Sequence, residues 1–237
     1  MKSNLVLPIT IVVAGALIAG AVFWAGKSST GTPNSQNSDA ITIKPYDPAT
    51  DHIIGNPDAP VMVIEYMDLE CPYCKTFDTT MYQIMDYYGV SGKVAWVQRP
   101  FPLASIHSKA PKEAEAAECA AEQGGDAAYF KFVDAVFKVT PSSNGLDLAQ
   151  LPVIAGQVGL NVDTFNTCLS SGKFAKKITD NYNDAIKAGG QGTPYTLIAV
   201  GTEAVALAGN QPYESMRAAI DAVLAQLPAS ATQTTGQ

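Results

Sequence analysis

The chain has 237 residues, of which 47% are hydrophobic, so it can bury one large globular core or two small ones. Its formal net charge is −7, and its Lys and Arg residues form no cluster of the kind that binds DNA or RNA. We therefore expect a globular domain with no nucleic-acid partner.

The first 27 residues are predicted to form an N-terminal transmembrane anchor. No charged residue lies between Lys2 and Lys27, and residues 5–25 are mostly Leu, Val, Ile, Ala and Gly, a run long enough to cross the hydrocarbon core. The alternative is a cleaved signal peptide, because Ala19-Gly20-Ala21 resembles a cleavage site, although the apolar run is longer than a usual signal core. In either case, we expect the residues that follow to be exported across the membrane.

Polar segments flank the expected folded domain. Residues 28–45 begin with "SSTGTPNSQNSDA", a small and polar composition that predicts a flexible tether. The chain closes with "ASATQTTGQ", which predicts a disordered tail over 229–237. The folded domain is therefore expected over 46–228.

A strand, a helix and a second strand are predicted in succession. Val61–Ile64 and Val94–Val97 are continuous apolar runs, typical of strands buried on both faces of a sheet. Between them, apolar residues recur at the helical spacing of three and four: Tyr73, Phe77, Met81, Ile84, Met85 and Tyr88. Gly89 follows, where a helix would end.

The segment from about 106 to 188 is predicted to be helical throughout. It divides at Gly and Pro residues into "APKEAEAAECAAEQGG", "DAAYFKFVDAVFKV", "LDLAQLPVIAGQVGL" and "VDTFNTCLSSGKFAKKITDNYNDAIKAGG". Pro152 should make the third of these helices start late or kink. A hairpin of Tyr195–Val200 and Glu203–Ala208 is expected next, followed by an amphipathic helix to Leu227.

Cys71 and Cys74 enclose only two residues at the predicted start of the first helix. Pro72 suits the first helical position because it lacks an N–H group that would be unpaired there. Cys71 then falls at the N-cap, near the free N–H groups of Tyr73 and Cys74 and the positive end of the helix dipole. These stabilise a thiolate at Cys71 and predict a nucleophile near neutral pH, with Cys74 as the resolving thiol.

Two other roles for this cysteine pair are less consistent with the sequence. Structural zinc needs four ligands, but the chain has no second closely spaced cysteine pair and only two histidines, His52 and His107. A purely structural disulfide would close a very small ring, which removes little entropy from the unfolded chain. We therefore favour a redox couple, with neither a metal ion nor another cofactor.

With this motif the chain resembles the DsbA-like thiol-disulfide oxidoreductases. The resemblance extends over roughly Ile53 to Leu227 and rests on five motifs: "DAPVMVIEYMDLECPYC", "RPFPL" with His107 after it, "AAECAAEQGG", "FNTCLSSGKFA" and "GTPYTLI". It implies an α/β thioredoxin fold with an inserted helical domain, here preceded by one transmembrane helix, and attack at Cys71. Strongly oxidising members often have His where this chain has Tyr73.

The resemblance also implies a substrate-binding surface beside the cysteines. The Thr193-Pro194 bond is expected to be cis, although X-Pro bonds are usually trans. In this fold the proline lies against the active-site disulfide, and an extended substrate pairs with the backbone of the preceding residue. Thr193, Pro194, Pro72 and Tyr73 are therefore the expected substrate-binding residues.

Two acidic residues and one histidine near the motif are interpreted differently. Glu65 lies on the buried strand, where a carboxylate is costly without a role or a partner. The resemblance implies a buried acid that relays the proton of Cys74; the alternative is an acid that reaches solvent at a sheet edge. Glu70 is expected to be a solvated charge, and His107 to be packed or to cap a helix, outside the catalytic set.

Cys119 and Cys168 both fall in the predicted helical insertion. Four cysteines permit three pairings, and if Cys71 pairs with Cys74 the other two are left to each other. A structural disulfide is favoured because the chain is expected in an oxidising compartment. The alternatives are two buried free thiols or a second redox pair.

These features predict an enzyme that exchanges disulfides with thiol-containing exported proteins, most simply by donating its own disulfide. A membrane-embedded protein of the family's usual kind would reoxidise it. The expected location is the cell membrane, with a single span and the catalytic domain on the periplasmic or extracellular side. The alternatives are an isomerase or reductase kept reduced, and a tethered peptide-binding or chaperone module.

Overall fold

The computed structural model describes residues 41–228. The expected transmembrane anchor at 1–27, most of the expected tether and the tail at 229–237 lie outside these residues. Among residues 41–228, no helix combines the length and the apolar composition that crossing a membrane requires.

A six-stranded sheet forms the centre of the described domain, in the order β1-β6-β5-β3-β4-β2. Its strands are β1 (Ile41–Thr42), β2 (His52–Ile54), β3 (Val61–Met67), β4 (Val94–Pro100), β5 (Tyr195–Val200) and β6 (Glu203–Ala208). Only β3 and β4 pair in parallel; the other neighbours are antiparallel. β3 and β4, the strands before and after the first helix, are therefore central strands of the sheet.

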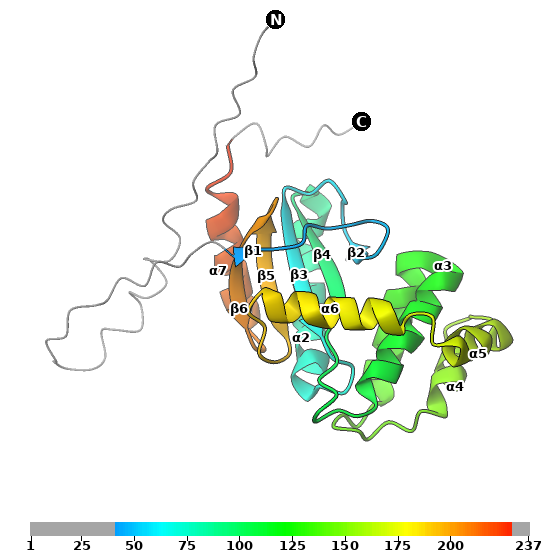
Figure 1. Ribbon diagram of the computed structural model, residues 1–237. Helices are drawn as coiled ribbons and strands as arrows, with labels where there is room; N and C mark the ends of the chain where they lie inside the picture. The colour runs from blue at the N-terminus through cyan, green and yellow to red at the C-terminus, as the bar shows by residue number, and fades with distance from the viewer. Residues whose placement is uncertain (1–40, 229–237) are drawn as a thin grey trace, which may run out of the picture. The chain divides into compact units, whose positions relative to one another are not determined.

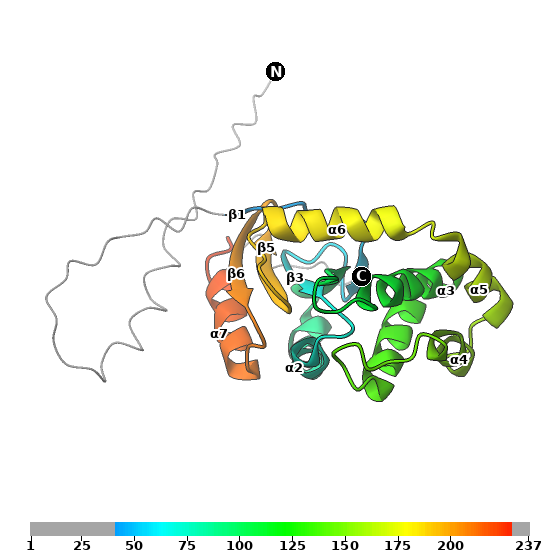
Figure 2. The ribbon, with the colours of Figure 1, turned by 60° about the horizontal axis from the view of Figure 1, so that its bottom comes forward.

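Helices cover both faces of this sheet (Figures 1 and 2). Helix α2 (Pro72–Tyr88) and helix α7 (Tyr213–Leu224) lie on one side, and α6 (Ala175–Lys187) lies on the other. The larger apolar cluster fills the α2 and α7 side, where α2 buries Phe77, Met81 and Ile84. The predicted strand-helix-strand unit is therefore confirmed.

The inserted segment is helical, with one more break than predicted. Helix α3 (Ala110–Val139) is bent at Gly124 and Gly125, and α4 (Gln150–Gln157) starts late enough to place Pro152 in its first turn. The last predicted helix is two helices, α5 (Val162–Ser171) and α6. They separate at Gly172, whose φ of 63° ends α5 in a left-handed conformation that suits glycine.

The described residues begin at Ile41, five positions before the expected start of the folded domain at 46. Ile43 is buried, and the buried Arg99 donates to the carbonyl oxygens of Lys44 (3.1 Å) and Pro45 (2.9 Å). Strands as short as β1 and β2 have no detectable hydrophobic alternation, so pairing with longer strands defines them. Residues 41–45 are therefore part of the fold.

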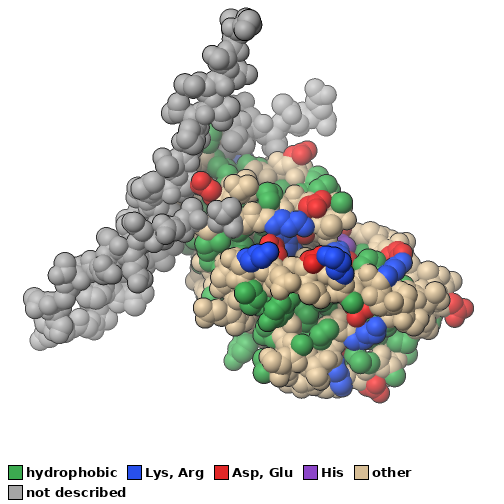
Figure 3. Space-filling view, in the orientation of Figure 1, with side chains coloured by type: hydrophobic (Ala, Val, Ile, Leu, Met, Phe, Trp, Pro, Cys, Tyr) green, Lys and Arg blue, Asp and Glu red, His purple; other side chains and the backbone are tan. Residues whose placement is uncertain are grey.

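Charged side chains of both signs are interspersed on the face seen in Figure 3, which shows Lys and Arg beside Asp and Glu along the line of α6. Helix α6 itself carries Lys176 close to Asp180, and Lys177 close to Glu118 of α3. This face of the described domain has no continuous basic surface of the kind that binds nucleic acid.

Candidate active site

The two closely spaced cysteines lie at the start of α2, directly after β3. Cys71 is the N-cap residue, with extended backbone angles, and Pro72 begins the helix. Both sulfurs are free thiols; Cys74 is fully buried and Cys71 is 4% exposed. Tyr73 between them is 63% exposed, so the motif lies at the protein surface.

The surroundings of Cys71 favour its thiolate. The neighbouring Cys74 thiol lowers the pKa of Cys71 most, and against the opposing effect of burial that pKa falls to about 6. The Thr193 side chain and the backbone N–H groups of Cys74 and Tyr73 lower it further. These two N–H groups act as hydrogen-bond donors to the Cys71 sulfur, at a helix start where the dipole also favours a negative charge.

Cys74 has the opposite character. Burial, followed by the proximity of Cys71, raises the pKa of Cys74 well above its ordinary value. Its sulfur accepts a hydrogen bond from the Asp68 backbone N–H at 3.5 Å. At neutral pH, Cys74 therefore keeps its proton when Cys71 has lost its own.

A distant loop completes the surroundings of Cys71. The Thr193-Pro194 peptide bond, between α6 and β5, is cis, as expected. The Cys71 thiol donates to the Thr193 carbonyl oxygen at 3.3 Å, across 122 positions of sequence. The structure thus brings Thr193, Pro194 and the cysteine motif together.

Glu65 lies beneath the cysteines on β3, which is a central strand, so the sheet-edge alternative does not hold. Its side chain is buried, and its Oε2 accepts from Trp96 Nε1 at 2.9 Å and from Gln98 Nε2 at 3.4 Å. Burial, and then the charge of Asp78, raises the pKa of Glu65 to about 8. Glu65 is therefore a protonated acid at neutral pH.

The expectation that Glu70 is a solvated charge is wrong. Its side chain is fully buried, and its Oε2 accepts from the backbone N–H groups of Asn144 and Gly145. The sequence gives no sign of these partners, because they follow α3, more than 70 positions away.

Asp68 was not singled out from the sequence, yet it organises one side of the site. Its Oδ2 accepts from the backbone N–H of Leu103 at 2.8 Å and lies 2.9 Å from His107 Nδ1, while its Oδ1 accepts from the backbone N–H of Glu70. His107 is buried, as expected of a packed histidine. Asp68 therefore links the β3–α2 turn to the segment before α3.

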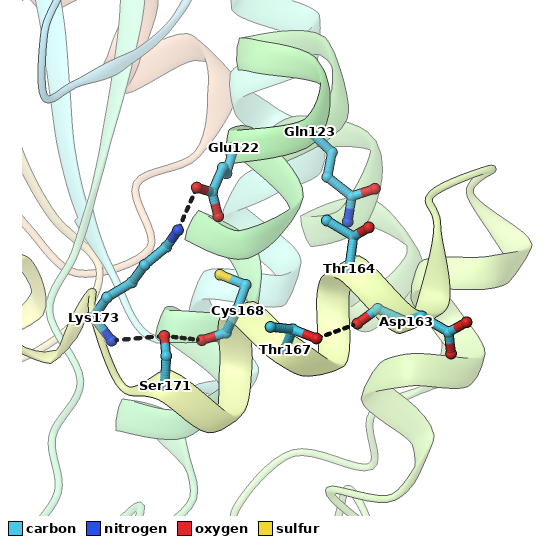
Figure 4. A pocket seen from close by; sticks show the side chains of 8 residues that line it. All are labelled: Glu122, Gln123, Asp163, Thr164, Thr167, Cys168, Ser171 and Lys173. Carbon is cyan, nitrogen blue, oxygen red and sulfur yellow. Dashed lines mark hydrogen bonds and ion pairs between the residues drawn. The ribbon is translucent and has the colours of Figure 1, made fainter.

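Cys119 of α3 and Cys168 of α5 form a disulfide, with Cα atoms 5.8 Å apart. Beside it lies an open pocket of about 560 Å³, shown in Figure 4, where Lys173 pairs with Glu122. Neither Cys71 nor Cys74 lines this pocket. Within residues 41–228, no group of three or more His, Cys, Asp or Glu side chains is arranged to hold a metal ion.

A family model described as thioredoxin matches residues 47–222, most of the chain. The chain belongs to the thioredoxin family. The match spans strands β2 to β6, the cysteine motif and the helical insertion, so one family accounts for the whole described site.

Solved structures place it among the DsbA-like proteins of that family. Pseudomonas aeruginosa DsbA2 is 26% identical, with a TM-score of 0.63 over 75% of this chain and 96% of that one. Wolbachia pipientis alpha-DsbA1 is 29% identical, with a TM-score of 0.64 over 74% and 92%. Oxidised BdbD from Bacillus subtilis shares the fold at 21% identity, with a TM-score of 0.67 over 79% and 99%. The described domain therefore has the DsbA-like form of the thioredoxin fold.

Curated relatives include much longer membrane proteins. Na(+)/H(+) antiporter NhaA 3 of Salinispora tropica is 34% identical over 150 residues, which is 63% of this chain and 22% of the antiporter. NhaA 1 of Mycolicibacterium gilvum is 28% identical over 177 residues, 73% of this chain and 27% of the antiporter. The chain thus spans about a quarter of these relatives, which contain a segment similar to it.

Proposed function

We propose that this protein is a thiol-disulfide oxidoreductase that donates a Cys71–Cys74 disulfide to exported proteins. The opposite pKa shifts of the two thiols carry the proposal: the pKa of Cys71 is lowered to about 6, whereas that of Cys74 is raised. Stepwise disulfide exchange requires this asymmetry. Cys71 is the sulfur that is attacked and that later leaves as a thiolate, whereas the Cys74 thiol keeps its proton.

The exchange begins from the oxidised protein. A substrate thiolate attacks the Cys71 sulfur, a substrate–Cys71 bond forms, and the Cys71–Cys74 bond breaks. Cys74 leaves as a thiolate and takes the proton of Glu65, which is protonated at neutral pH. A second substrate thiolate then attacks the substrate sulfur and releases Cys71 as a thiolate. The substrate is oxidised by two electrons, and the protein is reduced by the same two.

The lowered pKa of Cys71 supports donation rather than removal of disulfides. Only the reduced protein contains this thiolate, so stabilising it favours the reduced form and makes the disulfide the stronger oxidant. Each unit of pKa corresponds to about 1.4 kcal/mol, or roughly 30 mV for a two-electron couple.

The proposed site of action is outside the cytoplasmic membrane, with residues 1–27 as the anchor and a membrane-embedded protein as the reoxidising partner. Two observations support this placement. The sequence of residues 5–25 is long and apolar enough to span a bilayer. The antiporter relatives contain a similar segment within a membrane protein.

The test is oxidation of a reduced, unfolded secretory protein by the purified oxidised protein. Wild type should form substrate disulfides and Cys71→Ser should not. Cys74→Ser, with its Cys71 first converted to the mixed disulfide with glutathione, should release glutathione and accumulate a Cys71–substrate mixed disulfide visible by non-reducing electrophoresis. The matched control is Cys119→Ser with Cys168→Ser, which should still oxidise the substrate. Equal alkylation rates of Cys71 and Cys74 in reduced wild type near neutral pH would overturn the assignment of their roles.

The second candidate is a disulfide isomerase or reductase. The observation in its favour is Tyr73, which adds no positive charge beside the Cys71 thiolate, whereas strongly oxidising relatives often have His there. A scrambled-disulfide substrate in the same assay separates the two, because an isomerase restores native pairing only from the reduced protein. Binding of unfolded protein without turnover would instead support a chaperone module.

A further inference from the structure

The loop of residues 140–145, which follows α3, is fastened to the residues that flank the cysteine motif. The Ser143 backbone N–H donates to the carbonyl oxygen of Glu70 at 2.8 Å. Lys75 Nζ donates to the carbonyl oxygen of Thr140 at 2.8 Å. Glu70 directly precedes the first cysteine and Lys75 directly follows the second. The 140–145 loop therefore runs alongside the motif in the folded protein.

This loop and the loop that carries the cis proline lie on opposite sides of the strand that leads to Cys71. In the sheet, β3 lies between β5 and β4. The cis proline directly precedes β5, and the Thr193 carbonyl oxygen beside it accepts from the Cys71 thiol. The 140–145 loop is joined instead to the segment that follows β4, because the Asn144 side chain donates to the Ile106 carbonyl oxygen at 2.7 Å. Cys71 therefore lies between two loops.

The 140–145 loop has a costly conformation that the fold keeps in place. Its central residues, Ser142–Asn144, have φ of 64°, 52° and 67°, in the left-handed region that residues other than glycine rarely adopt. Such strain persists only where surrounding contacts fix the backbone, and it clusters at binding and catalytic sites. The Glu70 carboxylate provides these contacts, since its Oε2 accepts from the backbone N–H groups of Asn144 and Gly145. Glu70 therefore holds the loop in one conformation.

The outer surface of the loop is small and uncharged. Pro141, Ser143 and Gly145 are exposed, whereas Ser142 between them is buried. Within residues 41–228, the Ser143 carbonyl oxygen accepts no hydrogen bond. An extended peptide has backbone N–H groups that pair with exposed acceptors of this kind. The loop can therefore contact a substrate backbone without a clash or an unpaired charge.

We propose that the 140–145 loop is a second substrate-contacting surface and that Glu70 is the residue that positions it. The inference rests on the proposed function, in which a substrate thiolate attacks Cys71. A substrate bonded to Cys71 pairs with Thr193 on the β5 side and contacts Ser143 on the β4 side. The loop therefore favours extended peptide segments over thiols too short to reach it, such as glutathione.

Ser143→Tyr tests this contact, because its ring occupies the space of the substrate while its backbone N–H still donates to Glu70. Oxidised protein is mixed with a reduced, uncharged decapeptide that has one central cysteine or, separately, with reduced glutathione. Quenched-flow alkylation follows the opening of the Cys71–Cys74 disulfide. The ratio of the two rate constants, peptide over glutathione, should fall by about tenfold or more relative to wild type.

Ser170→Tyr is the matched control, because it makes the same change at an exposed serine of α5. Its ratio of rate constants should equal that of wild type. A wild-type ratio in Ser143→Tyr, or equal slowing with the peptide and with glutathione, would overturn the contact, since the loop would then not distinguish the two thiols.

Glu70→Ala and Glu70→Gln test the positioning role. Glu70→Ala removes the acceptor of two loop N–H groups and should lower the ratio, whereas Glu70→Gln keeps a side-chain oxygen and should restore most of it. A purely structural Glu70 predicts lower stability of Glu70→Ala, measured by urea denaturation, with a wild-type ratio. That result would overturn the positioning role.

Ser143→Tyr still decides the contact if Glu70→Ala does not fold. Wild type that opens its disulfide with neither thiol would refute the proposed function. Active wild type with an unaffected Ser143→Tyr ratio refutes only the role of the loop.

Discussion

At the scale of single residues, Cys71 and Cys74 are identical side chains three positions apart, yet their surroundings shift their thiol pKa values in opposite directions. Cys71 is the N-cap of α2, where the neighbouring Cys74 thiol and the positive end of the helix dipole stabilise a negative charge. Cys74 is one turn further in, where no solvent reaches it. Glu65, beneath both, is held as an acid by the same burial that keeps Cys74 protonated.

Glu65→Gln should remove this acid while keeping the size of the side chain. We expect disulfide donation below pH 8 to slow by about a hundredfold, the lower end of what a positioned acid contributes. The inflection that wild type should show near pH 8, where Glu65 loses its proton, should disappear. Stopped-flow kinetics from pH 5 to 9 would measure both. Glu214→Gln, at an exposed position, is the control, and a variant profile identical to wild type would remove Glu65 from the reaction.

At the scale of elements, one strained loop is held by a carboxylate. Ser142, Ser143 and Asn144 all have positive φ, a conformation that costs roughly 1–2 kcal/mol for each residue. The Ser143 N–H donates to the Glu70 carbonyl oxygen, and the next two N–H groups donate to the Glu70 carboxylate. The loop after α3 is therefore fastened to the residue that precedes Cys71.

Glu113 of α3 also interacts with the Glu70 carboxylate. It is fully buried with both oxygens lacking other partners, and burial, then its hydrogen bond with Glu70, raises its pKa to about 9. Because this folded-state pKa lies above the unfolded value, stability should be lost as pH rises from about 4.5 to 9.

Glu113→Gln keeps a hydrogen-bond donor to Glu70 but cannot ionise. We expect its free energy of unfolding to fall less steeply than that of wild type between pH 6 and 9, as measured by urea denaturation. Glu115→Gln, two positions along the same helix and beside Lys112, should retain the wild-type slope. Parallel slopes for wild type and Glu113→Gln would show that Glu113 is already ionised at pH 6.

At the scale of the whole domain, the insertion is fastened by a disulfide distant from the catalytic pair. Cys119 and Cys168 join α3 to α5 across 49 positions of sequence. A closed loop of this length removes entropy from the unfolded chain equivalent to about 4 kcal/mol.

Replacing both cysteines with Ala should therefore lower the free energy of unfolding by about that amount, and lower the Tm by several degrees. Thiol exchange by the folded variant should persist, because neither residue contacts the cysteine motif. Calorimetry and the exchange assay would measure the two effects. Unchanged stability, or loss of exchange in a folded variant, would contradict a purely structural role.

The sequence by itself determined what depends on neighbours along the chain. The apolar runs of β3 and β4, the spacing along α2 and the position of Cys71 before Pro72 are local, so periodicity and helix-end chemistry predicted them. Tertiary structure alone decided the environment of the charged groups. Glu70 is buried because a loop more than 70 positions away closes over it, and β1 and β2 exist because longer strands pair with them. Glu65 lies between Gln98 and Thr196 only because of the strand register, which is a non-local property.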